Sequence, residues 1–258
     1  MLTTDFVTGS PSWLDLGTPD TKAAAAFFGS VFGWDFRTAG PEAGGYGFFQ
    51  LDGKTVAALG PLTEDGASPA WTVYFHTSNA DATAEAVEQG GGTVRVEPFD
   101  VMNAGRMSAL TDPGGADFSV WQPAAIEGLE KTSDTNALCW TELHTADPAA
   151  AHGFYRHLFG WRSETMEVPG MTYTVLSTAA GEQQEASFGG IAPLHPGAEE
   201  TRWIPYFDVA DVDETAAKAE ANGGSVLMAA SDVPDVGRIA WLADPFGAPF
   251  AVIRPAPM

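Results

Sequence analysis

The stretch SWLDLGTPDTKAAAAFFGSVFGW, residues 12–34, returns in altered form as CWTELHTADPAAAHGFYRHLFGW at residues 139–161. The two stretches share 10 of 23 residues at an offset of 127. Both contain a strand-like opening, an aspartate before an alanine-rich run, and a closing Phe-Gly-Trp. Self-similarity of this kind indicates a duplicated structural unit.

The duplication extends through the rest of each half. Residues 71–123 match residues 203–255 with 22 identities in 53, at an offset of 132. The change of offset implies five extra residues in the second copy. The sequence therefore predicts two homologous domains, residues 1–126 and 137–258, joined by a polar linker at 127–136.

Each half contains the same order of expected elements. Residues 12–18 alternate like a half-buried strand, and Asp20 then caps a helix that Gly33 ends. Further strands are expected at 46–51, 55–59, 71–77, 93–97, 106–110 and 116–121, with a second helix at 81–89. We interpret each half as two β-α-β-β-β units, with three of the four strands assigned in the first unit. The chain is predicted to be an α+β protein built from four such modules.

Composition excludes several classes of partner. Among 258 residues, 34 are acidic and 12 are basic, which gives a net charge of −22. Nucleic acids and anionic membrane surfaces would be repelled. No run approaches the roughly 18 apolar residues of a membrane span. The single cysteine excludes an internal disulfide. We expect a cytoplasmic protein, with unconventional export left open, that acts as a monomer or homodimer on a small organic molecule.

Several motifs resemble the vicinal oxygen chelate superfamily of glyoxalases, bleomycin-resistance proteins and extradiol dioxygenases. The resemblance rests on the Phe-Gly-Trp helix ends at residues 32–34 and 159–161, and on the Asp-Pro turns at residues 112–115 and 244–247. It covers almost the whole chain. It is strongest to the tandem two-domain glyoxalase-like "hydroxylase" type of high-GC bacteria, a group that includes a mycobacterial secreted antigen. The resemblance implies tandem glyoxalase-like domains whose mixed sheets form cups, each cup a small-molecule site.

The resemblance also implies where metal ligands would lie. In metal-dependent members three side chains of the His, Gln or Glu type line each cup. The matching positions here are Trp13, Thr72 and Ser119 in the first half, and Trp140, Ile204 and Ala251 in the second. Neither set is a competent group of metal ligands. We therefore expect no metal cofactor, with a divalent metal at displaced ligands as the alternative.

Strand alternation indicates which side chains face each cup instead. Trp13 brings Asp15 to its own face, and Trp140 brings Glu142 and His144. The predicted ligand-binding residues in the strands are Trp13, Thr72, Tyr74, His76, Ser119, Trp121, Trp140 and Tyr206. Such a mixture of stacking surfaces and polar anchors suits a flat aromatic ligand.

Arg106 and Arg238 are a matched pair of cations in an acidic chain. One interpretation is an ion pair with the equally matched Asp100 and Asp232. The other is an anchor for a ligand anion at the cup rim.

Three functions remain open on the sequence alone. The leading hypothesis is a metal-independent protein that binds an aromatic or apolar organic compound, for resistance, sequestration or an accessory step in secondary metabolism. The second is a lyase, isomerase or hydroxylase-like enzyme that uses Asp15, Glu142 or His144 as catalytic acid–base groups, or a relocated divalent metal. The third is an interaction protein whose cups are filled by side chains.

Overall fold

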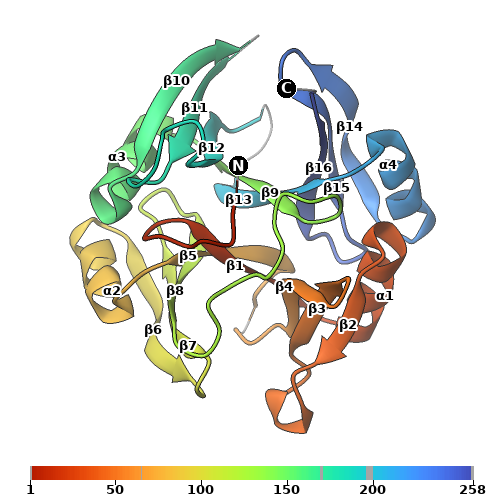
Figure 1. Cartoon of the computed structure of the whole chain (residues 1–258), viewed down its shortest axis with the longest axis horizontal. Helices are drawn as coiled ribbons and strands as arrows, with labels where there is room; N and C mark the ends of the chain where they lie inside the picture. Colours follow the sequence, from red (N-terminus) through yellow and green to blue (C-terminus); the bar gives the residue numbers. More distant parts are fainter. Residues whose placement is uncertain (1, 65, 169–170, 196–199, 257–258) are drawn as a thin grey trace. The chain divides into compact units, whose positions relative to one another are not determined.

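A computed structural model describes residues 2–64, 66–168, 171–195 and 200–256. Its sixteen described strands form two eight-stranded mixed sheets, with orders β2-β3-β4-β1-β5-β8-β7-β6 and β10-β11-β12-β9-β13-β16-β15-β14. The two orders are identical once the strands of the second half are renumbered from its start. The α+β class and the tandem, repeated architecture are therefore confirmed (Figure 1).

The elements follow the predicted order in both halves. In the first half they are β1 (Pro11–Thr18), α1 (Thr21–Phe32), β2 (Asp35–Thr38), β3 (Gly47–Leu51), β4 (Lys54–Pro61), β5 (Ala70–His76), α2 (Ala80–Gln89), β6 (Thr93–Val101), β7 (Gly105–Thr111) and β8 (Asp117–Pro123), with a 3-10 turn at Pro41–Ala43. In the second half they are β9 (Leu138–Thr145), α3 (Pro148–Phe159), β10 (Arg162–Val168), β11 (Met171–Ser177), β12 (Ser187–Pro193), β13 (Arg202–Asp208), α4 (Val212–Ala221), β14 (Ser225–Val233), β15 (Gly237–Ala243) and β16 (Pro249–Pro255).

Local chemistry explains the element ends. The Asp20 carboxylate accepts the Ala23 backbone N–H at 2.9 Å, and Gly33 ends α1 in the left-handed region with φ 73°. Asp147 and Gly160 do the same for α3. Asp52 and Gly53, both at positive φ, form the tight turn between β3 and β4. Strand β2 was not expected, because its four residues are mostly exposed and lack an alternating apolar pattern.

Close contacts divide the chain into two compact units that do not coincide with the sequence halves. The first unit comprises residues 1–13, 72–128 and 140–204, and the second comprises residues 14–71, 129–139 and 205–258. Each unit therefore joins a module of one half to a module of the other. Figure 1 shows the result, with α2 beside α3 and α1 beside α4. The domain boundaries at 126 and 137 stay a prediction about the repeat.

Aromatic side chains fill the core of each unit. In the first unit, Phe75 packs against Trp161 and Trp203, with ring centroids 5.1 Å apart in both pairs. In the second, Phe28 packs against Trp34 and Trp71. The tryptophans of both Phe-Gly-Trp motifs also fix neighbouring backbone: Trp161 Nε1 donates to the Gly9 carbonyl at 2.9 Å, and Trp34 Nε1 to that of Asn136 at 2.8 Å.

Candidate functional site

Strand β9 presents three predicted site residues on one face. Trp140, Glu142 and His144 alternate with Thr141 and Leu143, whose side chains face the other side because successive strand residues point in opposite directions. Glu142 is 8% exposed and His144 is 5% exposed. A buried carboxylate and imidazole require polar partners, because burial without them is costly.

Those partners come from the same unit. His144 Nε2 lies 2.7 Å from Glu142 Oε1, and the Tyr173 hydroxyl donates to Glu142 Oε2 at 2.6 Å. Trp140 Nε1 donates to the Tyr173 oxygen at 3.0 Å. The His195 ring stacks on the His144 ring, with centroids 5.3 Å apart and planes 24° apart. We call these five residues the Glu142 cluster.

Electrostatics decides which atoms carry protons in the cluster. Burial raises the pKa of Tyr173 well above its usual value, and the negative charge of Glu142 raises it further. The phenol is therefore protonated at neutral pH and donates to the carboxylate. His195 is exposed at the surface, and its pKa is lowered by partial burial and next by the nearby His144. It is mainly neutral at pH 7.

The second unit contains a partial counterpart of the Glu142 cluster, formed by residues of the first half of the sequence. The Tyr46 hydroxyl lies 3.5 Å from Asp15 Oδ2, and both side chains are only partly buried. Gly17 stands at the position that corresponds to His144. The first half therefore has an acid and a phenol but no imidazole at this place.

The structure also gives the register and burial of the other predicted ligand-binding residues, whose role stays a prediction. Tyr74 is in register with Ser119, and His76 with Trp121, on the parallel pair β5 and β8. Tyr74, Trp121, Ser119, Trp13 and Tyr206 are buried, whereas Thr72 and His76 are partly exposed.

The buried aromatic residues among these predictions make ring contacts and hydrogen bonds within their own units. Trp13 stacks on Trp121 with centroids 6.4 Å apart, and Trp121 Nε1 donates to the Ile126 carbonyl. In the second unit, Trp241 Nε1 donates to the Tyr206 hydroxyl at 3.1 Å. Partial burial lowers the pKa of His76, while the charge of Glu127 opposes this shift.

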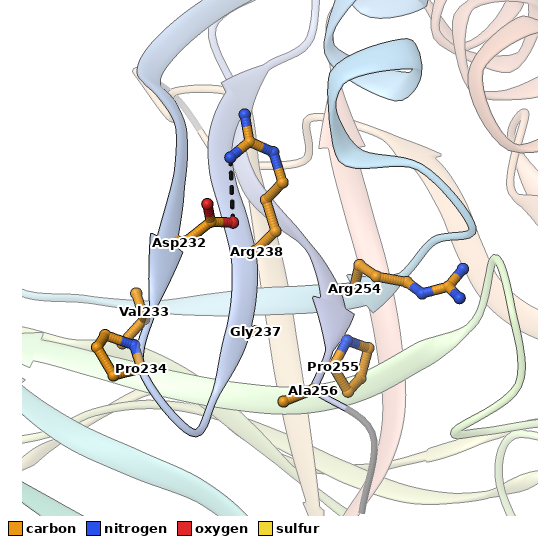
Figure 2. A pocket seen from close by; sticks show the side chains of 8 residues that line it. All are labelled: Asp232, Val233, Pro234, Gly237, Arg238, Arg254, Pro255 and Ala256. Carbon is orange, nitrogen blue, oxygen red and sulfur yellow. Dashed lines mark hydrogen bonds and ion pairs between the residues drawn. The ribbon is translucent and has the colours of Figure 1, made fainter.

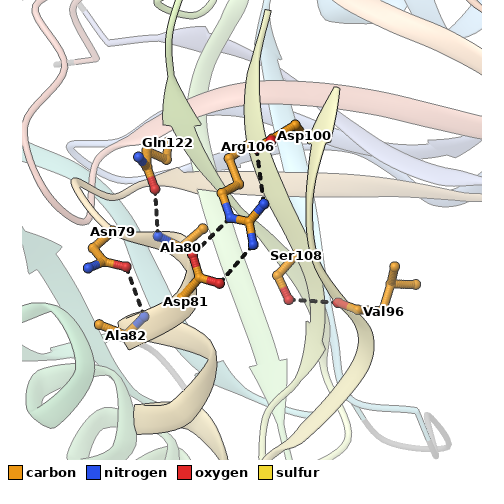
Figure 3. Close-up of polar contacts among 9 residues, drawn as sticks. All are labelled: Asn79, Ala80, Asp81, Ala82, Val96, Asp100, Arg106, Ser108 and Gln122. Atoms are coloured by element: carbon orange, nitrogen blue, oxygen red, sulfur yellow. Dashed lines mark hydrogen bonds and ion pairs between the residues drawn. The ribbon is translucent and has the colours of Figure 1, made fainter. Parts of the chain in front are cut away.

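The two matched arginines form ion pairs. Arg106 makes a two-pronged contact with Asp81, at 2.8 Å for both bonds, and reaches Asp100 at 3.0 Å (Figure 3). Arg238 contacts Asp213 and Asp232 in the same way. The predicted ion pairs with Asp100 and Asp232 are thus present. The stronger contacts, to Asp81 and Asp213 at the starts of α2 and α4, were not expected. A role as a ligand-anion anchor stays a prediction.

An open surface pocket of about 540 Å³ lies beside Arg238 in the second unit. Figure 2 shows Asp232, Arg238 and Arg254 along its edge, together with prolines and small residues. The Arg254 guanidinium donates to the Ala210 carbonyl at 2.6 Å. The arginines at this pocket are therefore already engaged, and the pocket does not include the Glu142 cluster.

The donor chemistry at the implied metal positions does not fit a divalent metal. Trp140 supplies an indole whose N–H is used by Tyr173, and Ile204 and Ala251 supply no donor atom. Thr72 and Ser119 offer neutral hydroxyls, which are poor ligands for transition metals. Within the described ranges, no group of three or more His, Cys, Asp or Glu side chains is arranged to hold a metal ion.

Sequence reasoning missed two members of the cluster. Tyr173 could have been found, because it matches Tyr46 at the offset of 127 that also relates Trp13 to Trp140 and Asp15 to Glu142. His195 could not, because its counterpart in the first half is Thr63 and its proline-containing loop gives no sign of a contact with His144. Only the fold brings its ring onto His144.

Comparisons with known proteins place the chain in a family. The profile of the Glyoxalase/Bleomycin resistance protein/Dioxygenase superfamily matches residues 10–120 and 137–252. The "Putative glyoxylase CFP32" of Mycobacterium bovis is 40% identical over 260 residues, covering 98% of this chain and 97% of that protein. The anthracycline biosynthesis protein DauV of Streptomyces sp. strain C5 is 39% identical over 270 residues, covering 97% and 95%.

A solved structure shares the fold at much lower identity. The 2,2',3-trihydroxybiphenyl 1,2-dioxygenase of Sphingomonas wittichii strain RW1 superposes with a TM-score of 0.67 at 14% identity, covering 96% of this chain and 91% of that one. No helix among the described residues is long and apolar enough to cross a membrane. Repeat, sheet order, profile match and full-length relatives agree, and the chain belongs to the glyoxalase/bleomycin resistance protein/dioxygenase superfamily.

Proposed function

We propose that this protein binds a small aromatic organic molecule at the Glu142 cluster, without a metal ion. One observation carries the proposal: an indole, a phenol, an imidazole and a carboxylate converge on one sheet face through hydrogen bonds of 2.6–3.0 Å. Indole and imidazole rings offer stacking surface, and the carboxylate–phenol pair offers a polar anchor. Ligand sites commonly combine a largely apolar surface with a few such fixed polar groups.

A relative supports the chemical class of the ligand. DauV is named for anthracycline biosynthesis, and anthracyclines contain fused aromatic rings that bear hydroxyl and carbonyl oxygens. A phenolic hydroxyl of such a ring would donate to the Glu142 carboxylate, which can accept more than two hydrogen bonds, and the flat ring would stack on the Trp140 indole. The net charge of −22 also favours a neutral or cationic ligand over a polyanion.

The donors at the implied metal positions support the proposal that binding needs no metal. Trp140 stands where a ligating side chain would be required, and its N–H is a donor that cannot bind a cation. We therefore route no step of the function through a metal. Affinity measured after chelator dialysis should equal the starting affinity, with less than about a tenth of an equivalent of transition metal by elemental analysis.

Tryptophan fluorescence tests the proposed site. A dihydroxyanthraquinone titrated into the protein should quench emission saturably. Trp140→Ala should weaken the affinity for this anthraquinone at least about tenfold, because one aromatic stacking contact is lost. Trp13→Ala, the matched variant in the first half, reports whether that half also binds. His157→Asn, on an exposed part of α3, serves as the control and should keep wild-type affinity. Unchanged affinity in Trp13→Ala/Trp140→Ala would refute the site.

A further inference from the structure

The Glu142 cluster has the organisation of an oriented base. Glu142 accepts the Tyr173 hydroxyl on one oxygen and faces His144 Nε2 with the other. As an ionised carboxylate, Glu142 has no hydrogen to donate, so it is the acceptor in both contacts. His144 Nε2 must then carry a hydrogen, and in the neutral imidazole the lone pair is on Nδ1.

From this arrangement we propose that His144 is a general base that removes a proton from an aromatic compound with an acidic C–H bond, such as one beside a ring carbonyl. The inference rests on the proposed binding of an aromatic molecule at the cluster. His144 is the catalytic residue, and Glu142 and Tyr173 are positioning residues. Glu142 fixes the tautomer and stabilises the imidazolium that forms when Nδ1 takes the proton.

The proton transfer needs no oxidant or metal. The C–H proton moves to His144 Nδ1, and the electron pair of the broken bond passes into the adjacent carbonyl group as an enolate. The imidazolium then gives a proton to another atom of the enolate, or exchanges its proton with water and returns a solvent proton to the same carbon. The net change is an isomerisation or an exchange of hydrogen with solvent, and atoms and charge balance.

Only the second half can carry out this step. The first half has Asp15 near the Tyr46 hydroxyl, but Gly17 replaces the imidazole. Each chain would therefore contain one proton-transfer site, despite the internal repeat. The Asp15–Tyr46 pair would at most bind a ligand.

The His195 ring covers one face of the His144 ring. His144 is buried, whereas His195 is exposed, and their rings are stacked. A molecule that reaches His144 from this side must displace the His195 ring. His195→Ala should therefore expose His144 to small substrates and raise the rate of proton removal.

A chromogenic probe tests the base directly. The flat aromatic 5-nitrobenzisoxazole opens when a base removes its ring C–H proton: the C–H pair completes a nitrile as the N–O bond breaks, and the oxygen leaves as a coloured phenolate. Wild type and His195→Ala should open the ring with saturation kinetics. His144→Asn should lower kcat about 100-fold in both backgrounds. His157→Asn, which removes an exposed imidazole from α3, should match wild type.

The positioning residues have a distinct signature. Glu142→Gln and Tyr173→Phe should lower kcat with little change in KM, because 5-nitrobenzisoxazole has no hydroxyl group to donate to Glu142 and both residues then act only through the base. Glu142→Asp should recover part of the kcat lost in Glu142→Gln. Melting temperatures of all variants separate this effect from loss of folding.

The outcomes separate the two proposals. The assignment of His144 as a general base would be overturned if His144→Asn left the rate of ring opening unchanged, both in wild type and in His195→Ala. The proposal that the cluster binds an anthraquinone would stand unaffected. Ring opening that depends on His144, in a protein that does not bind the anthraquinone, would support the base and refute the proposed ligand class.

Discussion

Gly190 of β12 lies directly beneath the ring of Tyr173, and a Cβ atom added to Gly190 would overlap the phenolic oxygen. Gly190 is also the strand partner of Glu142 on the parallel pair β12 and β9. The missing side chain therefore allows Tyr173 to lie across β12 and reach the Glu142 carboxylate. Gly60 leaves space for the ring of Tyr46 in the same way in the first half.

Gly190→Ala should displace Tyr173 and break its hydrogen bond to Glu142. Overpacking at such a site costs about 1–3 kcal/mol of unfolding free energy, measurable by urea denaturation. Removing the ring with Tyr173→Ala relieves the overlap, so the double variant should lose less than the sum of the single variants. Gly153→Ala, in the open middle of α3, should instead stabilise by about 0.5–1 kcal/mol. Additive losses at 190 and 173 would show that the two residues do not contact each other.

Phe28→Tyr should stabilise the protein, because the matching residue of the first unit is a tyrosine whose hydroxyl makes two buried hydrogen bonds. Tyr155 donates to Asp112 Oδ2 at 3.1 Å and accepts from Trp203 Nε1 at 2.9 Å. The repeat relates these residues to Phe28, Asp244 and Trp71 in the second unit. The Phe28–Trp71 rings also match the Tyr155–Trp203 rings, at 5.2 Å and 77° against 5.4 Å and 81°.

The second unit lacks only the bridging oxygen. Asp244 Oδ2 and Trp71 Nε1 are buried, and neither atom has a hydrogen-bond partner among the described residues. The Phe28→Tyr hydroxyl should supply both bonds and raise the unfolding free energy by about 1 kcal/mol. The reverse change, Tyr155→Phe, should lower it by about 1–3 kcal/mol. A destabilised Phe28→Tyr protein would mean that the ring of residue 28 lies elsewhere.

Asp244 should make the protein more stable as the pH falls from neutral. Burial raises its pKa in the folded state, although three backbone N–H groups oppose the shift. Between the ordinary carboxyl pKa and the raised value, the folded state binds more protons than the unfolded state, so unfolding free energy increases as pH decreases through the raised pKa. Asp244→Asn should show a smaller gain between pH 7 and pH 4. Asp35→Asn, at an exposed site on β2, controls for the removal of one negative charge. Equal gains in wild type and Asp244→Asn would contradict the assignment.

The Arg106–Asp81 pair should contribute little and lose its effect in salt. Both groups are partly exposed, and exposed pairs are screened by solvent and ions. Arg106→Gln should lower the melting temperature slightly, and a double-mutant cycle with Asp81→Asn should give a coupling that disappears near 1 M NaCl. A coupling that persists at that salt concentration would indicate a pair shielded from solvent.

Local features of the fold could be read from the sequence. Asp20 and Gly33 define α1 because a carboxylate cap and a left-handed glycine act on the nearest residues, and Asp52-Gly53 specifies its turn for the same reason. Strand alternation placed Trp140, Glu142 and His144 on one face. Strand β2 escaped notice because its exposed residues have no apolar period.

The sequence by itself determined the duplication, the four modules, the strand faces and the residue types at the implied metal positions, since all of these are carried by local order or by matching positions. Tertiary structure alone decided that modules from different halves share a compact unit, that Tyr173 and His195 reach Glu142 and His144, and that Trp71 and Asp244 lack a bridging hydroxyl. The physical reason is that periodicity specifies which face of a strand is buried but not which distant side chain is buried against it. That choice depends on the packing of the assembled chain.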